Sequence, residues 1–301
     1  VGSATIGRDH IDLEFLKKNN VRFSYAPGCN ANAVVDYVMA TLLSHCGSRQ
    51  LRKKQLGIVG FGNVGKRLAA CCQHFSIPVK VYDPLVDVPE EISTADFSHI
   101  LQSDAISLHV PLTHNREYST YHLFSDKQLS ALNTDALLIN TSRGAVVDNT
   151  ALKKIMNAQR DLAVALDVWE HEPEIDKALV TLCNYSTGHI AGYSELGKER
   201  GVKTIVNDLL AHLNADNNKI HVPVLERAEL SESARKLSDY SSLEEYAVEL
   251  SSVMNISSET RLFKMLLNAN GCSKDSIADH FDHYRKSYTL RAEFDYSYMI
   301  G

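Results

Sequence analysis

Short apolar runs alternate with segments of helical periodicity through the middle of the chain. Between residues 56 and 188 each apolar run has the length of a buried strand, and segments with apolar positions at helical spacing separate most of the runs. The predicted strands cover residues 57–60, 79–82, 104–109, 135–140, 162–167 and 184–187, and helices between them cover 97–103, 125–131 and 149–158. This alternation predicts an α/β fold built on a doubly wound parallel sheet.

The pattern changes on both sides of this region. Before it, residues 1–6 and 21–25 are predicted strands, and residues 9–18 and 33–44 are predicted helices. After it, residues 193–214 predict a long amphipathic helix whose apolar stripe consists of Leu196, Val202, Ile205, Leu209 and Leu213. We expect this helix to pack back on the first segment. A polar break at 214–219 precedes a region of mixed helix and strand, with a helix near 242–254 and strand-like alternation over 294–301.

Composition narrows the class of protein. The 301 residues are 44% hydrophobic and 23% charged, with a formal net charge of -6 and no basic block, which gives no support for binding nucleic acid. No apolar run approaches the ~20 residues that span a bilayer. The six cysteines are scattered and the thirteen histidines lack the spacing of metal ligands, so we expect reduced thiols, a cytoplasmic protein and no metal site.

A glycine-rich turn follows the first predicted strand of the sheet. Gly60, Gly62 and Gly65 fit the pattern G-x-G-x-x-G ahead of a helix, and Asp83 ends the next strand. In this context the glycines permit a tight turn, a close approach of backbone to a pyrophosphate, and close packing of helix on strand. A carboxylate such as Asp83 can bind the adenosine ribose and would repel a 2′-phosphate. The stretch therefore predicts a dinucleotide site that prefers NAD to NADP.

Arg143 follows the strand predicted over residues 135–140. Ligands of open α/β sheets bind at the carboxyl edge, where this side chain is expected. A guanidinium there can bind a carboxylate through two parallel hydrogen bonds. It can equally pair with a structural acid, and the stretch alone leaves both interpretations open.

Acidic residues and a histidine follow the last two predicted strands. Asp167 ends one strand, Glu170 and Glu172 lie in the loop after it, and His189 follows the final strand among small residues. A carboxylate beside a histidine stabilises the imidazolium, and histidine is well suited to proton transfer near neutral pH. A solvated acidic loop and a packed or surface histidine are the alternatives. The succession of Arg, Glu and His at strand ends favours a functional site.

Several motifs together resemble the D-isomer-specific 2-hydroxyacid dehydrogenase family. They are the glycine fingerprint, the loops at residues 140–149 and 166–173, and the His189 loop, with further similarity at residues 5–12 and 26–35. The resemblance spans nearly the whole chain and is strongest from 1 to 200. Within the family, the chain is most similar to the members that oxidise 4-phospho-D-erythronate with NAD in pyridoxine (vitamin B6) biosynthesis, so the resemblance implies an oxidoreductase with that substrate.

The resemblance also implies roles for individual residues. Arg143 would hold the substrate's carboxylate and carbonyl, His189 would be the general acid/base, and Glu172 would tune the histidine. Cofactor contacts would come from Gly60, Gly62, Asn63, Val64, Gly65, Asp83, Val110, Asp167 and Gly192. Substrate contacts would come from Thr5, Arg143 and Tyr193. Gly188 departs from the family, which usually has proline before the histidine, and we expect it to loosen the His189 loop.

The implied organisation has three domains. Residues 1–33 would be the remainder of a flavodoxin-like substrate domain whose N-terminal part is missing, and residues 34–190 an NAD-binding Rossmann domain. Residues 191–216 would form a helix returning to the substrate domain, and residues 217–301 a small α+β C-terminal domain that forms a homodimer and that we expect to be truncated.

The alternatives are another D-2-hydroxyacid dehydrogenase, such as one that acts on 3-phosphoglycerate, and a non-catalytic NAD-sensing protein. Arg285 and Arg291 are hypothetical phosphate ligands that would reach a partner subunit's site, against the simpler interpretation of surface arginines.

Overall fold

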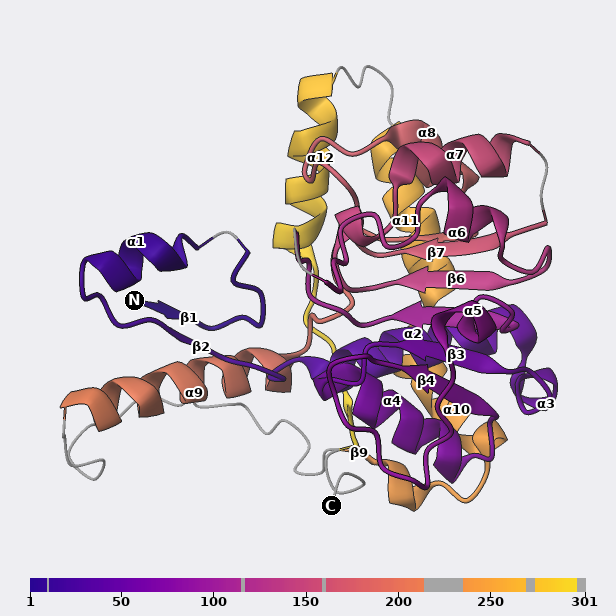
Figure 1. Cartoon of the computed structure of the whole chain (residues 1–301), viewed down its shortest axis with the longest axis horizontal. Coiled ribbons are helices and arrows are strands. Elements are labelled where there is room, and N and C mark those ends of the chain that lie inside the picture. The colour runs from indigo at the N-terminus through magenta and orange to yellow at the C-terminus, as the bar shows by residue number, and fades with distance from the viewer. Residues whose placement is uncertain (10, 115–116, 159–160, 214–234, 269–273, 297–301) are drawn as a thin grey trace.

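A six-stranded parallel sheet lies at the centre of the fold (Figure 1). The computed structural model describes residues 1–301 except 10, 115–116, 159–160, 214–234, 269–273 and 297–301. The strands are β3 (Leu56–Val59), β4 (Val79–Tyr82), β5 (Ala105–Leu108), β6 (Leu137–Asn140), β7 (Ala163–Leu166) and β8 (Tyr185–Ser186). Their order is β4-β3-β5-β6-β7-β8, with every neighbouring pair parallel. The prediction of a parallel α/β sheet is confirmed, with each strand close to its predicted position.

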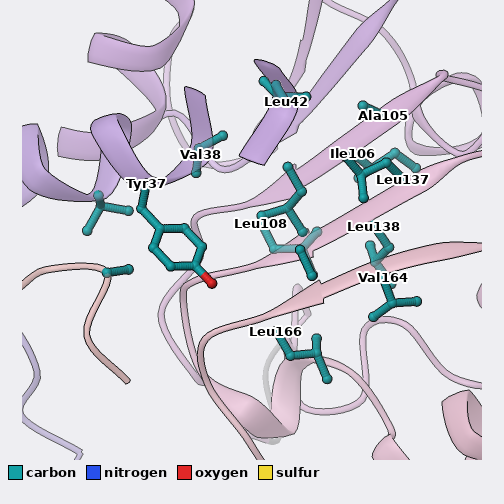
Figure 2. Close-up of a cluster of buried hydrophobic side chains, with 14 of the residues drawn as sticks. Tyr37, Val38, Leu42, Ala105, Ile106, Leu108, Leu137, Leu138, Val164 and Leu166 are labelled. Carbon is teal, nitrogen blue, oxygen red and sulfur yellow. The ribbon is translucent and has the colours of Figure 1, made fainter. Parts of the chain in front are cut away.

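Helices cover the sheet because its central strands are apolar on both sides. All four residues of β3, β5, β6 and β7 are buried. Helix α2 (Ala31–Cys46) packs against α4 (Asn63–His74) and is almost entirely buried along its first three turns. Figure 2 shows side chains of α2 meeting the sheet: Tyr37, Val38 and Leu42 lie near Ala105, Ile106, Leu108, Leu137, Leu138, Val164 and Leu166. Shortening one such leucine to alanine typically costs about 2–5 kcal/mol of stability.

Short helices connect the strands, three of them near their predicted positions and α8 where the sequence analysis predicts none. They are α5 (Phe97–Ile100), α6 (Asp126–Ser130), α7 (Asn149–Asn157) and α8 (Lys177–Leu182). Asp148 caps α7 by accepting a hydrogen bond from the Ala151 amide at 2.9 Å. The polar connector after α2 contains one further short helix, α3 (Ser48–Leu51).

The first segment lies along a helix that comes from much later in the chain. In Figure 1, β1 (Gly2–Ser3), β2 (Ser24–Tyr25) and α1 (Leu13–Lys18) lie at the left beside α9 (Glu195–Leu213), apart from the large sheet. The prediction that this helix packs on the first segment is confirmed, and Ile205 of the predicted apolar stripe lies against Gly2. Three other positions of the stripe do not face the segment, since Val202, Leu209 and Leu213 are 49–60% exposed. Gly201 faces the segment beside Ile205, because without a side chain it lets the Ala4 carbonyl approach.

Three α-helices, a short 3-10 helix (Leu237–Asp239) and a two-stranded sheet make up the described C-terminal region. The α-helices and strands are β9 (Arg235–Lys236), α10 (Leu243–Val253), α11 (Ile256–Asn268), α12 (Lys274–Ser287) and β10 (Phe294–Asp295). The helix near 242–254 is confirmed as α10, and α10 and α11 pack on α2. The predicted alternation over 294–301 begins as β10, whereas residues 297–301 and the polar break after residue 213 lie outside the described part of the chain. Among the described residues, no helix has the length and apolar character needed to cross a bilayer.

A carboxyl group is buried where the C-terminal strand crosses α2. Asp36 is fully buried, and it accepts hydrogen bonds from the Tyr296 hydroxyl at 2.5 Å and the Phe294 amide at 3.2 Å. Burial raises the pKa of Asp36 to about 8, although Tyr296 and Arg291 oppose the shift. His109, just after β5, is the opposite case, because burial lowers the pKa of its imidazole to about 3.

These two groups predict how stability depends on pH. Because the pKa of Asp36 is higher in the folded than in the unfolded chain, its stabilising contribution is complete below about pH 4 and declines as pH rises toward 8. The pKa of His109 is lower in the folded than in the unfolded chain, so His109 reduces the stability as pH falls below about 6.5. We therefore expect the free energy of unfolding to fall between pH 6.5 and 8, by up to about 1.4 kcal/mol per pH unit from Asp36. Urea unfolding of the wild type and of Asp36→Asn measures this decline, and equal slopes in both proteins would contradict it.

Candidate active site

His189 and Glu172 form a hydrogen-bonded pair at the carboxyl edge of the sheet. The His189 Nδ1 atom lies 2.7 Å from Glu172 Oε2, and the two side chains are 34% and 20% exposed. The second oxygen of Glu172 accepts the Trp169 amide at 2.8 Å, so the carboxylate is fixed in place. With Nδ1 held by Glu172, Nε2 is the ring nitrogen available to exchange a proton with a ligand.

The buried carboxylate of Asp167 holds the His189 loop. Its two oxygens accept the amides of Ile190 at 2.8 Å and Ala191 at 2.9 Å, and the Thr187 hydroxyl at 2.6 Å. The His189 amide also donates to the Asp167 carbonyl at 2.7 Å. His189 has a φ of 60°, in the left-handed region that non-glycine residues rarely adopt. These bonds offset the cost of that conformation and fix the direction of the imidazole.

A second layer of contacts reaches the same loop from α2 and from the Trp169 loop. The Tyr37 hydroxyl lies 2.7 Å from Thr187 Oγ1, and the Trp169 indole donates to the Thr187 carbonyl at 2.8 Å. Gly188 leaves space that aromatic rings use: a Cβ there would lie 2.7 Å from Tyr284 and 2.9 Å from Phe263. The structure thus gives a packing reason for glycine at the position where looseness was expected.

Arg291 of the C-terminal region grips the His189 loop from the other side. Its buried guanidinium donates to the carbonyls of Ile190 at 3.0 Å, Tyr193 at 2.8 Å and Ala33 at 2.9 Å, and also to the Ala191 carbonyl. The side chain is 7% exposed. These acceptors occupy both terminal nitrogens of the guanidinium, which argues against the hypothesis that Arg291 binds a phosphate.

Glu293, two residues after Arg291, forms further buried contacts beside the His189 loop. The Glu293 carboxylate is 2% exposed and pairs with Arg200 of α9, and it accepts hydrogen bonds from Ser194 and, at 3.4 Å, Asn32. Sequence reasoning missed this role. The available signal was a pair of charged residues at alternate positions just before an apolar strand pattern.

Arg143 lies beyond the end of β6 and contacts the first segment of the chain. Its Nε donates to Asp9 at 2.5 Å, and its Nη1 donates to the Ser142 carbonyl at 2.7 Å. Both members of the Arg143–Asp9 pair are about one third exposed. The pairing with an acid that the sequence left open is therefore present, and it joins the first segment to the sheet. The next residue, Gly144, packs against the backbone of Trp169, so the Arg143 and Glu172 loops touch.

The glycine turn has the geometry expected of a dinucleotide site. Gly60 has a φ of 98°, and a Cβ there would lie 2.5 Å from the His109 carbonyl and 3.0 Å from Val110. A Cβ on Gly65 would collide with the Gly60 carbonyl, so only glycine permits this close packing of α4. A Cβ added at Gly62 would meet no atom of the other described residues within 4 Å, and no side chain caps the start of α4. The free amides and the open space fit a pyrophosphate.

Asp83, Asn63 and Gly192 complete the surroundings of the turn. The Asp83 carboxylate accepts the amides of Phe61 at 2.7 Å and Leu85 at 2.9 Å, which fixes it at the end of β4. Asn63 lies against Gly28, where a Cβ would be 2.8 Å from the amide carbon of the asparagine. Asn30 lies against Gly192 in the same way. The loop at residues 26–30 therefore joins the glycine turn to the His189 loop.

Comparison with known proteins assigns this arrangement to a family. Residues 35–191 match the sequence profile described as D-isomer specific 2-hydroxyacid dehydrogenase, NAD binding domain. An erythronate-4-phosphate dehydrogenase from Acinetobacter baumannii is 40% identical over 300 residues, which cover 98% of this chain and 81% of that protein. The chain belongs to the D-isomer-specific 2-hydroxyacid dehydrogenase family.

Other members of the family extend the likeness. An erythronate-4-phosphate dehydrogenase from Wigglesworthia glossinidia brevipalpis is 42% identical over 225 residues, 74% of this chain and 60% of that protein. The matched part thus spans less than two thirds of that relative's length. A solved D-lactate dehydrogenase from Aquifex aeolicus, complexed with NAD and lactic acid, has a TM-score of 0.61 at 26% identity, covering 71% of this chain and 75% of the other.

The remaining predicted site residues of this family member lie in three separate segments. The Tyr193 amide donates to the Ile190 carbonyl at 2.8 Å, which places Tyr193 one turn beyond His189. Thr5 lies in the first segment, where its hydroxyl is 2.8 Å from Ser3 Oγ. Val64 is in the first turn of α4 and packs against the core.

Glu170, the other acidic residue of the loop that contains Glu172, belongs to a separate cluster. Glu170 lies 2.7 Å from His122 Nε2 and also accepts the Asn149 amide at 2.8 Å. Asp148 lies 3.6 Å from His122 Nδ1. The spacing would allow a metal ion, but these groups already bind one another and the start of α7. The cluster therefore fastens the Trp169 loop to α7.

Proposed function

We propose that the protein catalyses the NAD-dependent oxidation of 4-phospho-D-erythronate to 2-oxo-3-hydroxy-4-phosphobutanoate, a step of pyridoxine biosynthesis. The observation that carries the reaction class is the His189–Glu172 pair, set on a loop beside the NAD-binding domain and close to the Arg143 loop. The substrate rests on the relatives, because those from Wigglesworthia and Acinetobacter are named erythronate-4-phosphate dehydrogenases.

In the proposed reaction, each side chain has one task. Bound NAD⁺ would accept the hydride from C2. His189 Nε2 takes the C2 hydroxyl proton as the carbonyl forms, and Glu172 stabilises the imidazolium. Arg143 holds the carboxylate and the oxygen that becomes the carbonyl, which requires it to exchange part of its contact with Asp9 for the substrate.

The proposed cofactor contacts follow from the open turn at Gly62. The α4 amides and Asn63 would bind the pyrophosphate, with Gly60, Val64 and Gly65 shaping the turn and Asp83 on the adenosine ribose. Val110 would border the cofactor, and Asp167 and Gly192 would lie near the nicotinamide. Thr5 and Tyr193 would touch the substrate.

We propose the domain organisation implied by the resemblance for the same protein. Residues 1–33 and 191–216 would belong to the substrate domain, residues 34–190 would bind NAD, and residues 217–301 would form a homodimer. Exposed apolar side chains on the C-terminal helices, such as Val248 at 73% and Met265 at 64%, support a partner there. Free thiols at all five described cysteines support a cytoplasmic location.

A substrate panel tests the proposal. The protein with NAD⁺ is expected to produce NADH, followed by absorbance, from 4-phospho-D-erythronate in preference to 3-phosphoglycerate and D-lactate. NADP⁺ is expected to be a poor substitute because Asp83 would repel its 2′-phosphate. A preference for 3-phosphoglycerate would reassign the substrate within the family. NAD binding without turnover of any 2-hydroxy acid would favour an NAD sensor.

A further inference from the structure

A basic cavity opens beside Tyr193, between the start of α9 and the end of α12. Its volume is about 450 Å³, and its lining includes Tyr193, Lys198, Asp282, Arg285, Lys286 and Tyr288. Three of these side chains are cations and one is a carboxylate. In Figure 1, α12 is the yellow helix that stands at the edge of the sheet facing the first segment.

Two of the cations have no anionic partner among the described residues. Lys286 Nζ lies 3.3 Å from Asp282, which neutralises that carboxylate within α12. Neither Arg285 nor Lys198 forms an ion pair with any residue that the structure describes. Arg285 Nε is buried and has no hydrogen-bond acceptor there. A buried guanidinium nitrogen without an acceptor is costly, and because Arg285 lines an open cavity, an anion bound there would supply the missing acceptor.

The unpaired cations flank a single ring. Lys198 Nζ lies 4.7 Å from the centre of the Tyr193 ring, and the Arg285 guanidinium carbon lies 5.8 Å from the same centre. Tyr193 also meets Tyr288 edge-on at 6.0 Å, which holds the ring against α12. The cavity is therefore attached to the His189 loop through Tyr193 itself.

We propose that this cavity binds the phosphate group of the substrate, with Arg285 and Lys198 as its ligands. The inference rests on the proposed function and deepens it, because it names the side chains that select a phosphorylated 2-hydroxy acid. Arg285 would supply a planar fork of donors to the phosphate oxygens, and Lys198 a mobile point charge. With its carboxylate at Arg143 and C2 at His189, the substrate would extend its phosphate past Tyr193. The cations that bind it come from α9 and α12, outside the sheet that holds the reacting groups.

Kinetics of Arg285→Gln and Lys198→Gln at saturating NAD⁺ test the site. We expect Arg285→Gln to raise the KM for 4-phospho-D-erythronate by at least tenfold with kcat changed less than threefold, and Lys198→Gln to act in the same sense more weakly. The kcat/KM for unphosphorylated D-erythronate is expected to stay unchanged. Arg261→Gln is the matched control, since Arg261 is an exposed arginine of α11. A wild-type KM in both cavity variants overturns the proposal.

Inhibition by inorganic phosphate shows whether the cavity binds the phosphate of the substrate or a separate regulatory anion. Inorganic phosphate is expected to inhibit the wild type competitively against 4-phospho-D-erythronate and to lose that effect in Arg285→Gln. Noncompetitive inhibition overturns the assignment to the substrate. If the wild type does not oxidise 4-phospho-D-erythronate, the proposed function fails, and calorimetry with phosphate still decides whether the cavity binds anions. If the wild type binds phosphate and Arg285→Gln does not, the anion site is supported. If the wild type does not bind phosphate, the anion site is overturned.

Discussion

Replacing His189 by glutamine is expected to lower kcat with 4-phospho-D-erythronate by about 10²–10⁴-fold, the usual contribution of a general acid/base. Glutamine keeps a polar side chain of similar reach but cannot take the hydroxyl proton. The loop should keep its shape, because Asp167 binds its backbone rather than the imidazole. Stopped-flow and steady-state absorbance of NADH measure the loss, and calorimetry with NAD⁺ is expected to give unchanged affinity.

Glu172→Gln is the companion variant for this prediction. The amide can still bond the His189 ring and the Trp169 backbone, but it carries no charge to stabilise an imidazolium. We expect a smaller loss of kcat than in His189→Gln and a changed pH profile of kcat. Turnover of His189→Gln within tenfold of the wild type would show that another group takes the proton.

Replacing Arg291 by methionine is expected to reduce the free energy of unfolding by about 3–5 kcal/mol, because several buried carbonyls lose their donor and each unsatisfied buried polar group costs about 1–3 kcal/mol. The substitution leaves the carbonyls of Ile190, Ala191 and Tyr193 without their shared donor, while Glu293 keeps its ion pair with Arg200. Urea unfolding followed by circular dichroism measures the loss.

The same variant tests whether Arg291 positions the catalytic loop. At temperatures where Arg291→Met remains folded, we expect kcat to fall by at least tenfold while the affinity for NAD⁺ changes little. Arg291→Lys, which restores the charge but fewer donors, should recover part of both losses. Stability within 1 kcal/mol of the wild type together with a normal kcat would disprove the positioning role.

The sheet could be predicted from the sequence because its signals are local. Each strand is an apolar run, and the glycines at 60 and 65 are required by contacts that their own neighbours make. The proposed catalytic pair could be predicted as well, since Glu172 and His189 follow adjacent strands of a parallel sheet. The family resemblance implied the roles of the two residues, and the order of the strands explains why their side chains meet.

What the sequence did not reveal depends on contacts between distant segments. From the sequence, Arg291 was interpreted as a surface cation or a phosphate ligand. Nothing in the neighbouring sequence indicates that it binds four backbone carbonyls from other parts of the chain. The face of α9 was partly misjudged for a related reason. Apolar spacing favoured Val202 and Leu209, whereas close backbone packing at Gly201 decided which side turned inward.

The grip of Arg291 on the His189 loop also has a consequence during biosynthesis. Arg291 is separated by 101 residues from Ile190, whose carbonyl it binds. At about 5–20 residues per second, a ribosome needs roughly 5–20 s to add that interval, so the sheet can assemble well before this arginine is available. A nascent chain that has not reached residue 291 would contain every proposed catalytic side chain but would lack the hydrogen bonds from Arg291 to the His189 loop. Enzymatic competence would therefore arrive late in translation, and a prematurely terminated chain that ends before Arg291 could fold its sheet without becoming active.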